Sequence, residues 1–234
     1  MCKLKSAIIL KDRIFMSDYD SHSKMLEELG ITDDYFNASK VFVRAELTPE
    51  NGDAFSDIDG WKFSVDQDIT PEWFDEKDCT ERMRKAVKEW AKTHIFIGQN
   101  ALKISHGENI FIKDCEDVDI CGNATVKYIY GNATVESIYG NATVENIRGN
   151  ATVKYIYDNA TVENIYDNAT VENICGNATV KSISDNATVI SSPYTKWNNS
   201  ASLIIAGNAT FKDCYSRTIY QAGGWEFVEV KNNK

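Results

Sequence analysis

The sequence lacks the features by which several large classes of protein are recognised. No stretch approaches the roughly 20 consecutive apolar residues that cross a bilayer, and the apolar run at Ala7–Leu10 is shorter than the core of a secretory signal. Lysine and arginine number 25 against 35 acidic residues, for a formal net charge of −10. This charge argues against nucleic-acid binding, which depends on neutralising phosphates. We therefore predict a cytoplasmic protein without a membrane or nucleic-acid partner.

Signatures of catalysis and metal binding are also scarce. The chain has 3 histidines and contains no phosphate loop, nucleotide-binding glycine pattern or Gly-x-Ser-x-Gly element. Its 6 cysteines form no Cys-x-x-Cys pair. Cys121 and Cys175 occupy the same place in a repeat, two or three coils apart in any stacked arrangement, which is too far for a disulfide. We expect free thiols, no cofactor, no metal and no enzyme activity.

The dominant feature of the sequence is a tandem repeat. Asn-Ala-Thr-Val occurs eight times at nine-residue intervals between Asn123 and Val189, and a partial copy lies at Asn208–Phe211. One such unit buries too little apolar surface to offset the entropy of ordering it, so its stability must come from its neighbours. The repeat predicts an all-β solenoid, that is, a parallel β-helix.

Each unit is expected to form one short strand and one corner. Ala124 and Val126 alternate with Thr125, which places alanine and valine inward and threonine outward. The step of three from Val126 to Ile129 breaks this alternation and indicates a bend. A Gly-Asn or Asp-Asn pair then supplies a turn.

The residue after valine decides how many units make one coil. Like charges directly opposite one another on adjacent strands are unfavourable. With three units per coil, Lys127 would lie over Lys154. With two units, Lys127 faces Glu145 and Glu136 faces Lys154, and four of the five stacked pairs attract. We therefore predict two nonapeptide units, 18 residues, per coil.

The same stacking predicts ladders of outward side chains. Tyr139 is expected over Tyr157, and Arg148 between Tyr130 and Tyr166, which would allow aromatic and cation–π contacts. The candidate interaction surface comprises aromatic and basic residues of the repeat: Tyr130, Tyr139, Arg148, Tyr157, Tyr166, Lys127 and Lys154.

The chain is expected to have three parts. Residues 1–100 are predicted to form a small α+β domain, residues 101–210 the solenoid, and residues 211–234 an aromatic C-terminal cap over its open end. In the first part, we expect strands at Ser6–Leu10, Arg13–Met16, Lys40–Leu47 and Trp61–Val65, and helices at Asp20–Gly30 and Thr80–His94, the latter capped by Thr80. Four residues in excess of the repeat predict an excursion loop at Ser191–Asn198.

Two segments of the first part carry candidate chemistry. Asp18, Asp20 and His22 could combine carboxylates with an imidazole, but we favour a helix N-cap by Ser21 or Asp20, with His22 in the first turn. An enzyme site would require Asp18 or Asp20 within hydrogen-bond reach of His22. Asp57-x-Asp59-Gly60 is similar to the start of a calcium loop, but the remaining ligand positions do not follow, and a solvated acidic loop is preferred.

Several segments resemble a group of known proteins. Lys11–Phe15, Asp20–His22, Val87–Lys92 and the Gly-Asn-Ala-Thr-Val array resemble uncharacterised proteins of gut bacteria and their phages, in which a head domain precedes such repeats. This resemblance implies no activity and no site residues. The solenoid is also similar in kind to bactofilins and pentapeptide-repeat proteins, although its nine-residue unit matches neither motif.

The leading hypothesis is a non-enzymatic interaction or scaffold protein, in which the solenoid is a rigid platform for a protein partner. A phage-encoded factor that interacts with the host or inhibits its defences would fit. The alternatives are a self-assembling structural protein of the bactofilin kind and an enzyme sited in the N-terminal domain. An oligomer is left open.

Overall fold

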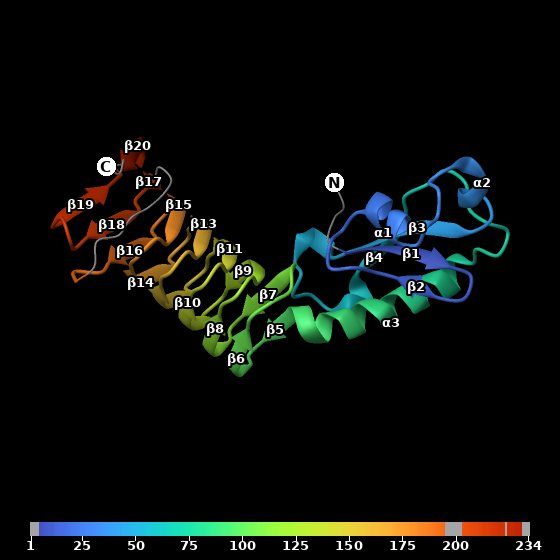
Figure 1. Cartoon of the computed structure of the whole chain (residues 1–234), viewed down its shortest axis with the longest axis horizontal. Helices are drawn as coiled ribbons and strands as arrows, with labels where there is room; N and C mark the ends of the chain where they lie inside the picture. Colours follow the sequence, from blue (N-terminus) through green and yellow to red (C-terminus); the bar gives the residue numbers. More distant parts are fainter. Residues whose placement is uncertain (1–4, 195–202, 223, 231–234) are drawn as a thin grey trace. The chain divides into compact units, whose positions relative to one another are not determined.

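The computed structural model of the chain describes residues 5–194, 203–222 and 224–230. The chain divides into two units, Met1–Ile95 and Phe96–Lys234 (Figure 1). None of the helices in the described ranges is both long enough and apolar enough to cross a bilayer.

Unit 1 is a small α+β domain, as predicted. Its antiparallel sheet has the order β2-β1-β3-β4. The strands are β1 (Lys5–Leu10), β2 (Ile14–Phe15), β3 (Phe42–Thr48) and β4 (Lys62–Val65). The helices are α1 (His22–Glu28), α2 (Tyr35–Ala38) and α3 (Glu76–His94), and two 3₁₀ turns lie at Glu50–Gly52 and Ile58–Gly60.

Helices α1 and α3 cover opposite faces of this sheet (Figure 1). Ile8 of β1 points toward α1, where it packs with Met25 and Leu26. Because side chains alternate along a strand, Lys5 points to the other face. There its ammonium lies 4.8 Å from the centre of the Trp90 ring of α3.

Helix α3 begins earlier than the sequence suggested. The predicted cap, Thr80, lies inside the helix, and Asp75 is the N-cap, its carboxylate accepting a hydrogen bond from the Asp78 N–H at 2.8 Å. Aspartate caps a helix at least as well as threonine does, and Glu76 and Asp78 in the first turn interact favourably with the helix dipole. The short helix α2 was not predicted.

Unit 2 is a parallel β-solenoid of two sheets, and successive strands of the array alternate between them (Figure 1). Sheet I contains β5 (Ile95–Ile97), β7 (Ile110–Lys113), β9 (Thr125–Tyr130), β11 (Thr143–Ile147), β13 (Thr161–Ile165), β15 (Thr179–Ile183), β17 (Leu203–Gly207) and β20 (Gly224–Val230). Sheet II contains β6 (Asn100–Ile104), β8 (Glu116–Ile120), β10 (Thr134–Ile138), β12 (Thr152–Ile156), β14 (Thr170–Ile174), β16 (Thr188–Ser191), β18 (Thr210–Asp213) and β19 (Thr218–Gln221).

The strand register confirms two units per coil. Val135 pairs with Val153 and Ile138 with Ile156, in each case a residue 18 positions later. The residue after valine takes no part in these pairings. Valine and isoleucine, three positions apart, can therefore both point inward, although strict alternation would separate them.

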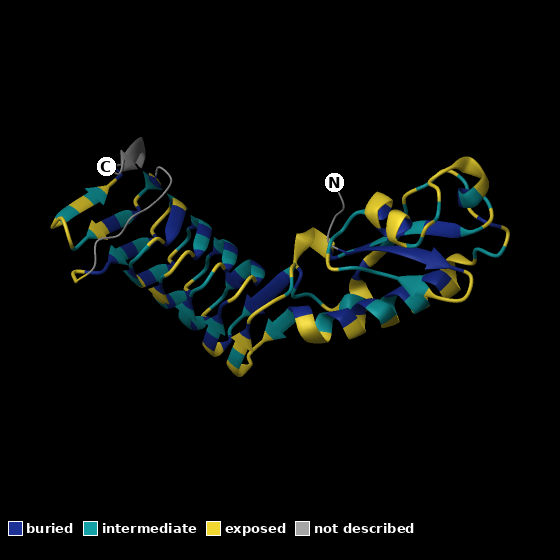
Figure 2. Cartoon of the chain, in the orientation of Figure 1, coloured by how far each residue is buried: buried dark blue, intermediate teal, exposed yellow. Residues whose placement is uncertain are grey.

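The solenoid core consists of the three apolar positions of the repeat. From Ala124 to Val189, every alanine, valine and isoleucine in those positions is fully buried between the sheets. The threonines between them face outward and are mostly half-buried, which produces the alternating bands along each strand (Figure 2). The predicted inward and outward positions are thus confirmed.

Polar ladders hold the corners of successive coils together. Gly149 begins one corner with φ of +72°, and Asp167 fills the same place one coil later with φ of +58°. The Asp167 carboxylate accepts a hydrogen bond from the Gly149 N–H at 3.0 Å. The amide of Asn150 donates to that of Asn132, one coil earlier, at 3.2 Å. Between Gly122 and Asp185, this corner position holds only glycine or aspartate, because it requires a left-handed backbone that few other residues adopt readily.

At both ends of the array the stacking of the coils continues, although the sequence departs from the repeat. At the start, Cys115 is buried in the alanine position and Ile120 pairs with Ile138. At the end, the amide of Asn208 donates to that of Asn186 at 3.3 Å, so the ladder resumes after four extra residues. Half of the expected loop Ser191–Asn198, residues 195–198, lies outside the described residues. Strands β19 and β20 then pair antiparallel with β18 and β17, which ends the parallel pairing of both sheets.

Candidate functional site

Charged ladders run along both sheets of the solenoid. On sheet I, Lys127 Nζ lies 2.5 Å from Glu145 Oε1 and Lys181 Nζ lies 2.6 Å from Glu163 Oε1. On sheet II, Lys154 forms an ion pair with Glu136, and this hydrogen bond is the main cause that raises the pKa of the lysine. The candidate residues Lys127 and Lys154 are thus neutralised within the array.

Sheet I carries one cluster of aromatic and basic residues, Tyr128, Tyr130, Arg148 and Tyr166, termed here the sheet I cluster. The Arg148 guanidinium lies 4.5 Å from the ring centre of Tyr130, as expected, and 5.0 Å from that of Tyr128. Burial raises the pKa of Tyr166, and a hydrogen bond with Arg148 partly offsets this. The prediction omitted Tyr128, although its spacing of two from Tyr130 indicates the same outward face.

Sheet II carries a second cluster, Tyr139, Tyr155 and Tyr157, termed here the sheet II cluster. The rings of Tyr139 and Tyr157 stack at 5.2 Å between centres and 4° between planes, which confirms the expected ladder. A hydrogen bond with Cys121, reinforced by burial, raises the pKa of Tyr139 to about 12. Tyr155, also missing from the prediction, is 50% exposed.

The seven candidate residues therefore do not form a single surface. Both sheets direct their inner faces into one shared core, so their outer faces point in opposite directions. Lys127, Tyr130, Arg148 and Tyr166 belong to sheet I and its corner, whereas Tyr139, Lys154 and Tyr157 belong to sheet II and the opposite corner. The alternation of units between the sheets separates the two groups.

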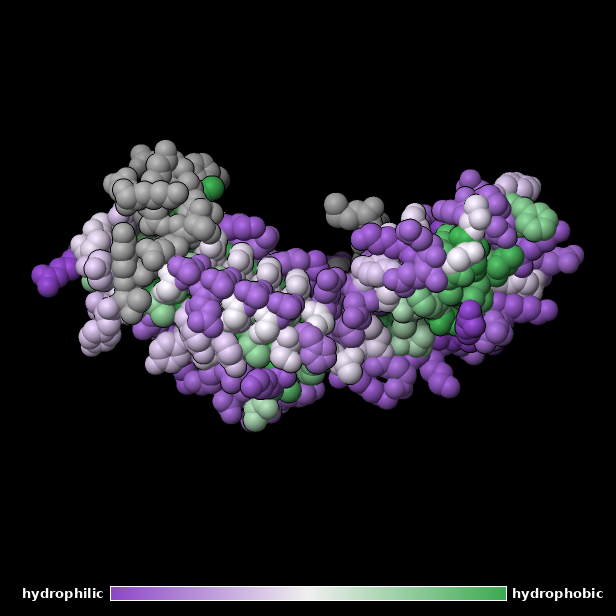
Figure 3. Space-filling model, in the orientation of Figure 1, coloured by the Kyte–Doolittle hydropathy of each residue, from purple (hydrophilic) through white to green (hydrophobic). Residues whose placement is uncertain are grey.

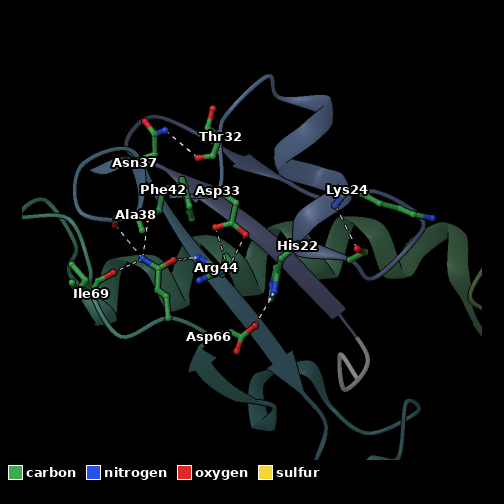
Figure 4. Close-up of polar contacts among 12 residues, drawn as sticks. His22, Lys24, Thr32, Asp33, Asn37, Ala38, Phe42, Arg44, Asp66 and Ile69 are labelled. Carbon is green, nitrogen blue, oxygen red and sulfur yellow. Dashed lines mark hydrogen bonds and ion pairs between the residues drawn. The ribbon is translucent and has the colours of Figure 1, made fainter. Parts of the chain in front are cut away.

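In unit 1, the first residue of α1, His22, makes contacts other than those an enzyme site would require. Its ring is buried, with Nε2 3.1 Å from the Ala45 carbonyl oxygen and Nδ1 3.2 Å from Asp66 Oδ2 (Figure 4). Ser21 caps the helix, as favoured, by accepting a hydrogen bond from the Lys24 N–H.

The two carboxylates proposed as partners of His22 lie elsewhere. Asp18 Oδ1 is 3.2 Å from Nε2 of His94, the last residue of α3. Asp20 Oδ1 is 3.2 Å from Nζ of Lys5, which is fully buried. The grouping of His22 with Asp18 or Asp20 that the alternative of an enzyme site would require is therefore not formed.

The fold instead brings three distant residues together. The ligand atoms of His22, Glu46 and Asp66 all lie within 4.8 Å of one another. A cavity of about 510 Å³ adjoins this group, lined by Glu46 and, among others, Lys62 and Ser64. No local pattern links these residues, because His22 and Asp66 are 44 positions apart and meet only through the pairing of β3 with β4.

The calcium-like segment forms an ordinary turn. The Asp57 carboxylate accepts a hydrogen bond from the Asp59 N–H at 3.1 Å and caps the 3₁₀ turn. Asp59 forms an ion pair with Lys88 at 2.6 Å. Cys79, Cys115, Cys121, Cys175 and Cys214 are free thiols, and Cys2 lies outside the described residues.

Comparison of the chain with known protein families, curated proteins and solved structures finds no match. The resemblance to proteins of gut bacteria and their phages therefore stays a prediction, and function must be argued from the residues themselves.

Proposed function

We propose that the protein is a non-enzymatic interaction protein whose solenoid presents the sheet II cluster to a protein partner. The observation that carries this proposal is the half-exposed ring of Tyr155 beside the stacked rings of Tyr139 and Tyr157. Tyrosine is enriched among the residues that dominate the energy of protein interfaces. Figure 3 shows that the described surface of the solenoid in this view is mostly hydrophilic.

The rigidity of the platform supports this proposal. The backbone under Tyr155 is fixed on either side by Val153 and Ile156, both fully buried. A side chain held on a rigid strand loses little conformational entropy on binding. The sheet I cluster is less suited to a partner, because Arg148 already lies over the rings of Tyr128 and Tyr130.

The charges around the sheet II cluster indicate the chemistry of the partner. Lys154 is neutralised by Glu136, whereas Glu172 in the next coil and Asp158 in the adjoining corner are exposed. With a net charge of −10 on the whole chain, we expect a partner whose contact surface has a pocket for tyrosine and a basic rim. A phage-encoded factor directed at a host protein would fit this description.

Site-specific photocrosslinking tests the proposal. A benzophenone amino acid at position 155 should crosslink one partner, and the same group at position 128, on the outer face of the opposite sheet, should not. With the partner purified, Tyr155→Ala should weaken binding by tenfold or more, whereas Tyr128→Ala on sheet I should not. Equal crosslinking from both positions, or unchanged binding by Tyr155→Ala, would exclude this surface.

Self-assembly is the competing proposal, and the end of the solenoid argues against it. The antiparallel strands β19 and β20 interrupt the parallel ladder that end-to-end stacking would continue. Light scattering at high protein concentration should report a mass close to 26.3 kDa. A mass that grows with concentration would favour the structural protein instead.

A further inference from the structure

Both ring nitrogens of His22 face oxygen acceptors. Nε2 lies 3.1 Å from the carbonyl oxygen of Ala45, and Nδ1 lies 3.2 Å from a carboxylate oxygen of Asp66 (Figure 4). A carbonyl oxygen only accepts hydrogen bonds, so Nε2 carries the hydrogen and the neutral ring turns the lone pair of Nδ1 toward the carboxylate. That contact becomes favourable when Nδ1 binds a positive group, either a proton or a metal ion.

The second carboxylate favours the metal ion. Glu46 completes a group of three ligand atoms within 4.8 Å of one another. A proton on His22 can be shared with one carboxylate at a time, whereas a divalent ion neutralises two. The 3.2 Å between His22 Nδ1 and Asp66 Oδ2 is close to the roughly 3.4 Å that separates two ligands of a tetrahedral zinc ion.

Ser6 provides an independent observation at the same place. Its side chain is fully buried, and its Oγ has no hydrogen-bond partner among the described residues. Ser6 pairs directly with Glu46 across strands β1 and β3, so the two side chains share the sheet face on which His22 lies. Buried hydroxyls are as a rule hydrogen-bonded, and a water molecule held by a metal ion on this face would supply the missing partner.

We propose that His22, Glu46 and Asp66 bind a divalent first-row transition-metal ion. One imidazole with two carboxylates suits zinc or manganese, whereas magnesium and calcium prefer oxygen ligands alone. The hydrogen bond from Nε2 to Ala45 fixes the ring in the way that ligating histidines are usually fixed.

Three protein ligands leave at least one coordination position for another molecule, as in catalytic zinc sites. Of the three ligands, Glu46 lines the cavity of about 510 Å³, from which a small ligand would approach that position. The site could not be predicted from the sequence, because its ligands come from α1, from β3 and from the residue after β4. No two of them are separated by a spacing typical of a metal-binding motif.

Metal titration of the full chain tests the site. After treatment with a chelator, Zn²⁺ is titrated by calorimetry into the wild type, Asp66→Asn and Glu46→Gln, with folding checked by circular dichroism. Each substitution is nearly isosteric, and the Asp66 side chain is 63% exposed, so Asp66→Asn should fold. His94→Gln is the matched control, because His94 also contacts a carbonyl oxygen and one carboxylate, but no second carboxylate among the described residues joins them in a potential metal site.

We expect one Zn²⁺ site that Asp66→Asn and Glu46→Gln each weaken by more than tenfold and that His94→Gln leaves unchanged. Binding by cysteine thiols would persist in all variants, and Mn²⁺, followed by electron paramagnetic resonance, provides a probe that prefers oxygen ligands. The proposal is overturned if the wild type binds neither ion, if Asp66→Asn binds both as the wild type does, or if His94→Gln weakens binding equally.

Discussion

Lys127 Nζ lies 2.5 Å from Glu145 Oε1, 18 positions further along the chain. A coil of three units would have placed Lys127 over Lys154 instead, two like charges about 4.8 Å apart. The alternation of lysine and glutamate therefore favours a coil of two units over a coil of three. These residues lie outside the apolar core.

Reversal of one charge in this ladder should destabilise the solenoid. Lys127→Glu would set three carboxylates in succession, with Glu145 and Glu163. We expect the free energy of unfolding to fall by about 0.5–1 kcal/mol at low salt, and the difference to shrink near 1 M salt because the charges are screened. Urea denaturation measures both. The double variant Lys127→Glu/Glu145→Lys should recover the loss, and if it is no more stable than the single variant, the pairing has no energetic role.

Truncation in the core should cost far more than truncation on the surface. Ile156 is fully buried between the sheets, so Ile156→Ala should lower the free energy of unfolding by about 2–5 kcal/mol. Glu172→Ala, at an exposed site on the next strand of sheet II, should change it by less than about 0.5 kcal/mol. Comparable losses in urea denaturation would contradict the assignment of inward and outward positions.

The corner position should accept aspartate but reject valine. Gly176 has φ of +65°, and a Cβ there would lie 3.5 Å from its nearest neighbour, the N atom of Asp158. Gly176→Asp should change stability by less than about 0.5 kcal/mol, because its carboxylate could accept from that N–H as Asp167 does from Gly149. Gly176→Val should cost at least about 1–2 kcal/mol, since β-branched residues fit poorly at positive φ. Thermal unfolding measures the stability of the two variants. If both lose the same stability, the requirement for a left-handed backbone at this corner is refuted.

Alkaline pH should weaken the solenoid through Tyr139. The folded state raises the pKa of this tyrosine from 10.0 to about 12, chiefly through the hydrogen bond with Cys121. The resulting stabilisation is fully present below pH 10 and disappears as the pH rises toward 12, because the unfolded chain ionises first. Tyr139→Phe should therefore lose less stability than the wild type between about pH 9 and pH 11.5, as measured by urea midpoints.

A second variant isolates the cause of this pKa shift. Cys121→Ala removes the hydrogen bond and should lower the pKa of Tyr139 toward 10, which an ultraviolet difference titration against Tyr139→Phe can detect. Cys115 is also buried and lies at the other end of strand β8. Cys115→Ala should therefore leave that titration unchanged. A titration of Tyr139 that is unaffected by Cys121→Ala would assign the shift to burial instead.

The architecture of unit 2 could be predicted from the sequence, because the residues that determine it recur in every repeat. The inward positions follow from the spacing of Ala124, Val126 and Ile129, and the coil length follows from the charges of Lys127 and Glu145. The division of the tyrosines between two sheets also follows from the alternation of units, and it distributes the candidate surface residues over two opposite outer faces.

The structure of unit 1 could be predicted only in part. Strands and helices follow from local patterns, but the start of α3 was wrong because the apolar stripe begins only at Met83, close to Thr80, whereas the helix starts a turn earlier at the stronger cap, Asp75. The group around His22 depends on the pairing of β3 with β4, which leads Asp66 back toward α1. Contacts of such long range have no local signature, so the sequence offered only the neighbouring Asp18 and Asp20 as possible partners of His22, a grouping less favoured than the helix N-cap.

The polar ladders at the corners join residues one full coil apart, and this limits how such a column can change in length. Gain or loss of 18 residues would copy or delete one strand of each sheet and leave the asparagine ladders at the corners matched. Gain of a single nonapeptide ahead of Tyr155 would transfer that ring, and every strand after it, to the other side of the column. The number of nonapeptide units can therefore change without moving the outer surface only when units are gained or lost in pairs, although the sequence itself repeats at every ninth residue.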